Sequence, residues 1–464
     1  MVGTLGVAAG LGLAWTALAL ALGNAIGTVF VAAHSAQGPQ LGIPQMIQSR
    51  AQFGVIGAGL PLVAVVVTYL LYSAADGLII EGTLRALAPI DNNVALVVFA
   101  VTTLVIAYVG YELIHRIGTV LTFVSGAFFA VAACLLLSRP AAVAGLTAQP
   151  MGHLSAAAFV LMMTQAAAWS LSYGPFVADY SRYLPKSVSA TATFWYTGLG
   201  CFLGSTAIML FGAYLAVSNA GSMTDPSNAI ASLFGPGRQI ARCLILVGVI
   251  YGNVLNLYSA YMSTSTIFSG IRRMSRIGAG RKLAIMFVLI SISTAISMLA
   301  QSNFQAYFAD ILSAMLYLLV PWSAINLADY YLVHKGRYIV ADMFRIDGVY
   351  GAYRWKTIIV FLLGIALQVP FMSFSFFRGT FAQWIGADLA WAPGLLMPGL
   401  LHVLVERRFG KPTRGSDVEG PLERAKSDAE AQVVHSDRSL VLRKRRHRRV
   451  VHGRDRAFYR CRVA

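Results

Sequence analysis

The stretch from Thr164 to Lys186, TQAAAWSLSYGPFVADYSRYLPK, decides how the rest of the chain is interpreted. It begins as an apolar segment, meets Gly174-Pro175 part-way along and ends in a polar Asp-Tyr-Ser-Arg-Tyr sequence. Because proline lacks a backbone donor and clashes with the preceding turn, this pair predicts that the helix kinks or splits. In a bilayer, broken backbone persists only where it is buried in protein or lines a cavity, and many secondary transporters bind their substrate there. A proline kink in an ordinary packing helix is the alternative interpretation.

The composition excludes a soluble globular protein. Hydrophobic residues make up 57% of the 464 residues and charged residues only 12%, whereas soluble domains have about 25% charged residues. We therefore expect an all-α, multi-pass membrane protein. The four cysteines, Cys134, Cys201, Cys243 and Cys461, show no CxxC spacing, which argues against a metal site or a disulfide framework. No cofactor is expected.

The net charge of +17 does not indicate a nucleic-acid partner once it is located. Residues 406–464 contain 17 of the 36 Lys and Arg residues but only 8 of the 19 Asp and Glu residues. We interpret residues 406–464 as a basic, disordered cytoplasmic tail, and residues 1–405 as the transmembrane domain. Such a tail can be attracted to anionic membrane lipids, or it can be solvated without a specific role.

Apolar runs of membrane-spanning length follow one another through the transmembrane domain. We predict eleven spans, at residues 12–34, 57–80, 94–115, 117–137, 155–180, 191–217, 239–268, 283–300, 307–333, 356–378 and 384–405. Fourteen basic residues fall in one set of alternate loops and five in the other, so the first set and the tail should be cytoplasmic. The connection from Asn219 to Gln239 should then be extracellular. The odd number of spans suggests that one N-terminal helix is missing.

Four motifs resemble one transporter family. They are GPQLGIPQMIQSRAQFG (Gly38–Gly54), YGPFVADYSRYLP (Tyr173–Pro185), GNVLNLYSAYMS (Gly252–Ser263) and PWSAINLADYYLVHKGRYIVADMF (Pro321–Phe344). In this order and spacing, which extends over Leu11 to Arg408, the chain resembles the purine–cytosine permease family, also called nucleobase:cation symporter family 1.

The resemblance implies a five-plus-five inverted-repeat transporter fold with two extra C-terminal helices, in which helices 1 and 6 are discontinuous. The eleven spans would be helices 2 to 12, the Gly174-Pro175 break would lie in helix 6, and Met1 to Gly10 would be the last turns of helix 1. The implied function is a permease of the inner (plasma) membrane that imports cytosine or a purine together with a cation. The alternatives are a permease for allantoin, hydantoin or a vitamin, or a truncated, inactive permease.

Tyr72 and Asp76 lie one helical turn apart and therefore share a helix face. An ionisable residue within a span is costly, so Asp76 is predicted to have a function, as an acceptor for ring N–H or amino groups or as a proton carrier. The resemblance places the two residues where an aromatic and an amide-type residue contact the base. The alternative is that Asp76 is merely solvated near the extracellular headgroups, since Glu81 and Arg85 lie close in sequence.

Asn253 and Asn256 lie near the centre of another span, where carboxamides could read the donors and acceptors of a nucleobase. The resemblance places the substrate-binding asparagine at Asn256, while interhelical hydrogen bonding is the alternative for both residues. Trp169 precedes the helix break, and its indole suits stacking on a planar heterocycle, with Tyr72 covering the other face. With Gly174 at the break, these residues complete the predicted substrate-binding set.

The coupling ion is a proton or sodium. The resemblance implies a sodium site made of helix 1 carbonyls and of hydroxyls on helix 8, where this chain has Val249, Ile250 and Tyr251. Because sodium requires several oxygen ligands, we expect proton coupling, with Asp76 as the first candidate carrier.

Other function classes lack their signatures. The chain has neither an HExxH nor a GxSxG motif, so we predict no enzyme and no catalytic residue. A channel would require rings of charge along a pore. Three histidines, His34, His115 and His334, fall at predicted span ends and are expected to be solvated. Asp179 and Arg182, spaced i, i+3, are expected to form an ion pair at the cytoplasmic boundary.

Overall fold

The computed structural model describes residues 2–109, 111–139, 153–223, 225–272, 278–301 and 304–409, with backbone only at 111–117, 220, 271–272 and 304–306. Within these ranges the regular structure is helical, apart from a single bridge between Ser373 and Arg378. The predicted tail from residue 410 onward lies outside the described residues.

Eight long helices match predicted spans. They are α2 (Leu13–Leu41), α4 (Gly59–Leu87), α5 (Asn92–Val109), α6 (Tyr111–Leu137), α10 (Ala190–Ser218), α12 (Arg238–Arg272), α13 (Ala279–Ala300) and α14 (Phe304–Ala328). In the described residues, each of these eight regions has a stretch that is long and apolar enough to cross a membrane.

The other three predicted spans consist of shorter elements. They correspond to α8 (Ala156–Leu171) with α9 (Gly174–Ser181), to α15 (Trp355–Gln368), and to α16 (Thr380–Ile385) with α17 (Trp391–Phe409). Short helices α1 (Val2–Ala8), α3 (Gln45–Phe53) and α11 (Pro226–Ser232) complete the set used below.

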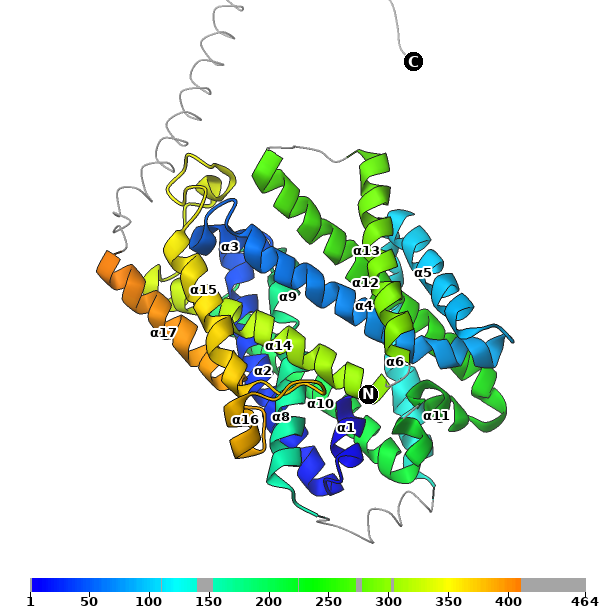
Figure 1. Ribbon diagram of the computed structural model, residues 1–464. Helices are drawn as coiled ribbons and strands as arrows, with labels where there is room; N and C mark the ends of the chain where they lie inside the picture. Colours follow the sequence, from blue (N-terminus) through cyan, green and yellow to red (C-terminus); the bar gives the residue numbers. More distant parts are fainter. Residues whose placement is uncertain are drawn as a thin grey trace, which may run out of the picture. The chain divides into compact units, whose positions relative to one another are not determined.

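The helices pack in two groups, and each group contains helices that are far apart in the sequence. Helix α2 contacts α1, α8 and α10, and α1 also contacts α8 and α10, while α4, α5, α12 and α13 all contact one another. Helix α14 contacts both α4 and α8, and α15 and α17 pack against α14 (Figure 1). The broken segment α8–α9 therefore belongs to one group, while the helices that carry Asp76 and Asn256 belong to the other.

The predicted helix break is confirmed. Helix α8 ends at Leu171 and α9 begins at Gly174. Pro175 lies in the first turn of α9, where a backbone N–H has no intrahelical partner and its loss costs little. A side chain at Gly174 would place its Cβ 3.3 Å from Cδ2 of His34. Glycine at this position thus lets the break lie close to α2.

Helix α2 extends seven residues beyond its predicted end at residue 34. It continues through Pro39 to Leu41, although proline removes the backbone donor that would bond to Ser35. The Ser181 hydroxyl donates to the Ser35 carbonyl instead, at 2.8 Å. His34 is consequently inside the helix and fully buried, and its predicted position at a solvated span end is wrong.

Candidate functional site

A cavity of about 350 Å³ lies beside the helix break, between α2, α4, α8, α9, α10 and α12. Four of the six predicted site residues line it: Tyr72, Asp76, Trp169 and Asn256. They come from α4, α8 and α12, so the fold brings together residues that are far apart in the sequence, 180 positions in the case of Asp76 and Asn256. Among the residues that line this cavity, Asp76 is the only one with a carboxylate, and none is a lysine, arginine or histidine.

Asp76 and Asn256 supply the one carboxylate and the one carboxamide of the cavity wall, which also carries the hydroxyls of Ser170, Ser172, Ser205 and Ser259. Nδ2 of Asn256 donates to Oδ2 of Asp76 at 3.1 Å. Since both side chains are partly exposed and line the cavity, their remaining polar atoms can meet a ligand. In the described part of the chain, Oδ1 of Asp76 and Oδ1 of Asn256 accept no hydrogen bond.

Aromatic side chains form another part of the wall. The rings of Tyr72 and Trp169 contact each other edge to face, with centroids 5.5 Å apart and planes at 87°. A planar ligand can therefore lie parallel to one ring but not to both, so this conformation does not form the predicted sandwich. Tyr69 and Phe176 contribute a second aromatic pair, with centroids 4.5 Å apart.

A hydrogen-bond chain ties these aromatic rings to the helix break. The Ser172 hydroxyl donates to the Trp169 carbonyl at 2.6 Å, so Ser172 Oγ is left to accept from the Tyr72 hydroxyl, with which it is in contact. Ser172 lies between α8 and α9, where backbone carbonyls leave the helical ladder. Tyr72 thus links α4 to the break as well as lining the cavity.

The other two predicted residues lie outside the cavity. Asn253 is fully buried and donates to Thr103 of α5 at 3.1 Å, which is the interhelical bond considered as its alternative. Gly174 faces His34 and lies near Trp322 rather than the cavity.

A second buried polar cluster surrounds Asp329, at the end of α14. Its Oδ1 accepts from His402 at 2.9 Å and from His334 at 3.1 Å, and its Oδ2 accepts from Gln52 at 2.9 Å and from Tyr338 at 2.7 Å. This cluster was not predicted from the sequence, and His334, which was expected to be solvated, has a side chain that is only 11% exposed. An ionisable residue inside the last predicted span, His402, was the signal that could have revealed it.

His34 and Asp179 join the short helix α3 to its neighbours. His34 stacks on Trp322 with ring centroids 4.9 Å apart, and its Nδ1 is 3.2 Å from Nε2 of Gln45. The carboxylate of Asp179 accepts the Gln45 backbone N–H at 2.8 Å. Arg182 donates to the Asp179 backbone carbonyl, so the predicted ion pair between these side chains is wrong. The His115 side chain lies outside the described residues.

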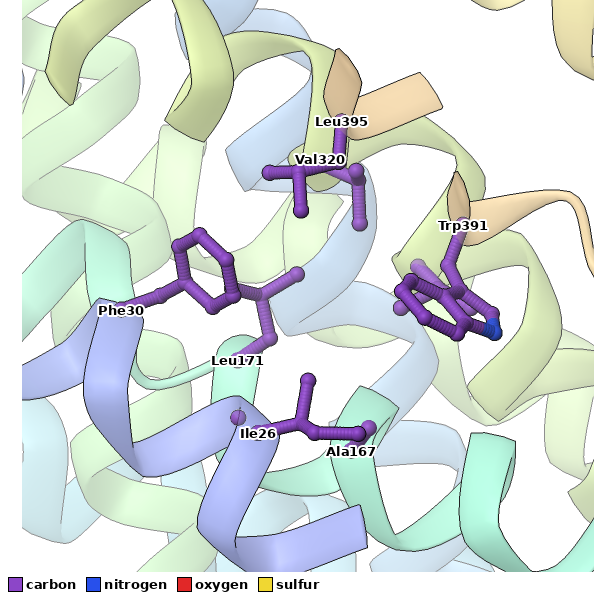
Figure 2. A pocket seen from close by; sticks show the side chains of 9 residues that line it. Ile26, Phe30, Ala167, Leu171, Val320, Trp391 and Leu395 are labelled. Carbon is purple, nitrogen blue, oxygen red and sulfur yellow. The ribbon is translucent and has the colours of Figure 1, made fainter. Parts of the chain in front are cut away.

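A smaller crevice serves as a contrast. It lies between α2, α8, α14 and α17, and Figure 2 shows Ile26, Phe30, Val320 and Trp391 around it. Its volume is about 20 Å³ and all nine lining residues are apolar. Because it has little more room than one water molecule requires and no side-chain hydrogen-bonding group aimed into it, it does not suit a polar ligand.

Comparisons with known proteins identify the family of this chain. Residues 1–392 match the family described as permease for cytosine/purines, uracil, thiamine, allantoin. The chain is 40% identical over 411 residues to "Putative purine-cytosine permease YxlA" of Bacillus subtilis, in an alignment that covers 88% of this chain and 89% of that protein.

Solved structures share the fold. Mhp1, a nucleobase-cation-symport-1 family transporter, in a closed conformation with bromovinylhydantoin bound, superposes with a TM-score of 0.68 at 16% identity, over 90% of this chain and 92% of that one. The inward-facing conformation of Mhp1 gives a TM-score of 0.68 at 17% identity, over 90% of each chain. A mutant form of the manganese transporter of Eremococcus coleocola gives 0.51 at 13% identity, over 88% of this chain and 94% of that one.

Proposed function

Because this chain belongs to the family of permeases for cytosine/purines, uracil, thiamine and allantoin, we propose that it imports a nucleobase, cytosine or a purine, together with a cation. As a member of that family it is a multi-pass permease of the plasma membrane and not an enzyme. The identity of the base and of the cation is our proposal.

The observation that carries the proposal is the Asp76–Asn256 pair beside Trp169 in the cavity at the helix break. A planar heterocycle that stacks on the Trp169 indole would direct its polar edge toward the carboxylate and the carboxamide. A cavity of about 350 Å³ is within the usual range for small-molecule sites. Tyr72 would then contact the ligand through its ring edge, because its plane is perpendicular to that of Trp169.

Proton coupling fits the residues present better than sodium coupling does. Val249, Ile250 and Tyr251 supply no aliphatic hydroxyl at the positions where the family resemblance implies sodium ligands. Asp76 is the one carboxylate among the residues lining the cavity, so it is the lining residue that can exchange a proton between an anionic and a neutral form. We therefore assign the coupling proton to Asp76.

Uptake of radiolabelled cytosine tests the substrate. Loss of one hydrogen bond in Asn256→Ala should raise the KM about tenfold, and loss of stacking in Trp169→Leu should raise it about ten- to a hundredfold. Matched controls are Asn253→Ala, which removes the bond to Thr103, and Trp391→Leu in the apolar crevice of Figure 2. Both controls should keep the wild-type KM.

Three outcomes would each contradict one part of the proposal. If the control variants change the KM as much as the site variants do, the cavity at the helix break is not the substrate-binding site. If allantoin or hydantoin competes while no nucleobase does, the substrate is a related heterocycle. For the cation, uptake is measured with choline in place of sodium, with and without a protonophore, and sodium-dependent, protonophore-insensitive uptake would refute proton coupling.

A further inference from the structure

The Asp76–Asn256 hydrogen bond limits what the pair can offer to a ligand. An ionised carboxylate only accepts hydrogen bonds, so the group that Asn256 directs at Asp76 must be its NH2. This contact occupies Oδ2 of Asp76 at 3.1 Å. Two oxygens then remain without a partner in the described residues, Oδ1 of Asp76 and Oδ1 of Asn256. With Asp76 ionised, both oxygens are acceptors.

Protonation changes one of these two oxygens and not the other. Because Oδ2 of Asp76 already accepts the Asn256 N–H, a proton taken up by this carboxyl is carried on Oδ1. That oxygen then becomes a donor, while Oδ1 of Asn256 remains an acceptor. The pair therefore presents two acceptors when Asp76 is ionised, and a donor beside an acceptor when Asp76 is neutral.

Nucleobases also differ in whether they present an acceptor beside a donor or two donors. On the Watson–Crick edge, cytosine and adenine each have a ring-nitrogen acceptor next to an amino donor, whereas guanine has a ring N–H next to an amino donor. A mismatch leaves a buried polar group unpaired or sets two acceptors against each other, which a site of this kind rejects strongly. The neutral pair thus matches the Watson–Crick edge of cytosine or adenine, and the ionised pair matches the Watson–Crick edge of guanine.

We propose, on the basis of the nucleobase permease function above, that the substrate edge decides whether a proton is bound. A base with a ring-nitrogen acceptor beside an amino group binds together with a proton on Oδ1 of Asp76. A guanine-type edge binds to the ionised carboxylate without one. Recognition and proton coupling then occur at the same atom, and cytosine or adenine is the substrate class that a proton symporter with this site carries.

The surroundings of Asp76 leave it to titrate without a nearby charge partner. The other titratable residues that line the cavity are Tyr69, Tyr72, Tyr173, Tyr180 and Cys201, and all of these are neutral at physiological pH in their ordinary states. The polar side chains that α12 contributes to the cavity wall, Asn256 and Ser259, carry no charge. Glu81 and Asp225 line a different pocket, toward the end of α4.

Calorimetry on the purified full-length protein tests the inference. Binding of cytosine is measured in two buffers that differ in ionisation enthalpy, which gives the number of protons taken up per ligand. We expect the number of protons taken up per bound cytosine to approach one at pH values at which Asp76 of the unliganded protein is ionised. In the same pH range, the cytosine affinity should fall about tenfold per pH unit. Guanine should take up no proton and should not lose affinity as the pH rises.

Asp76→Asn always presents a donor beside an acceptor, as the neutral Asp76–Asn256 pair does, because its amide NH2 takes the place of the protonated Oδ1. This variant should bind cytosine with an affinity that does not change with pH, take up no proton, and bind guanine more weakly than the wild type does. The matched control is Asp91→Asn, at an exposed carboxylate at the start of α5. This control should retain both the proton uptake and the pH dependence.

The possible failures are distinguishable. If the wild-type protein binds no base at any pH, the proposed function itself is wrong. If cytosine binds without proton uptake, if cytosine and guanine affinities change with pH in parallel, or if Asp76→Asn still takes up a proton, the inference is overturned while the permease function stands. The wild-type proton count decides the question even if the variant does not fold.

Discussion

Adding one methyl group at Gly27 should impair base binding although Gly27 lies outside the cavity. Gly27 is on the face of α2 that packs against α8. A Cβ at this position would lie 2.6 Å from Cβ of Ser170 and 2.7 Å from the carbonyl oxygen of Ala167. Ordinary contacts are 3.4 to 4 Å, so the two helices must separate by about 0.7 Å at this point.

The affected turn carries Trp169. Binding groups must keep their positions to within about 0.5 Å, and a misplacement of about 1 Å can cost a hundredfold. Gly27→Ala should therefore raise the KM for cytosine uptake by about tenfold or more. Overpacking of this kind also costs about 1–3 kcal/mol of stability, which a lower thermal unfolding midpoint in detergent would report.

Gly204→Ala is the matched control. Gly204 lies inside the spanning helix α10, and a Cβ there would meet no atom within 4 Å. Alanine is a better helix former than glycine by up to about 1 kcal/mol, so this variant should keep the KM and gain slightly in stability. A Gly27→Ala protein with the KM and midpoint of the Gly204→Ala protein would refute the argument that α2 positions Trp169.

Two further predictions concern stability and orientation. Asp329→Asn should lower the free energy of unfolding by about 1–3 kcal/mol, because its NH2 group would face the donors of Gln52 and Tyr338. The control Asp347→Asn, at an exposed carboxylate, should not change the thermal unfolding midpoint. Equal midpoints for the two variants would contradict the hydrogen bonds assigned to Asp329. Ser232→Cys, at an exposed position of α11 within the predicted extracellular connection, should react with an impermeant thiol reagent on intact cells in an otherwise cysteine-free chain. Protection of this cysteine, with a cytoplasmic control behaving normally, would reverse the predicted orientation.

The positions of the spans could be predicted because each depends on local composition, and the split at Pro175 depends on local stereochemistry. The extent of α2 could not, because its continuation through Pro39 is supported by the hydroxyl of Ser181, which lies 146 residues from its partner Ser35. The same limit applies to Asn253 and Asn256. They are three residues apart on one helix, yet the rotation of α12 directs Asn253 to α5 and Asn256 to the cavity. That rotation depends on packing against neighbouring helices.

The number of donors around each carboxylate is the reason that we expect different roles for two intramembrane aspartates. A carboxylate has about four lone-pair sites. In the described part of the chain, Asp329 accepts four hydrogen bonds from four side chains, which leaves no site for a ligand. Asp76 accepts one, from Asn256, and faces a cavity. Both residues satisfy the rule that an ionisable residue in a span is functional, but only Asp76 retains an unpaired oxygen at which a base and a proton can meet. Substitution of Asp329 should therefore alter stability first, whereas substitution of Asp76 should alter substrate selection and proton uptake.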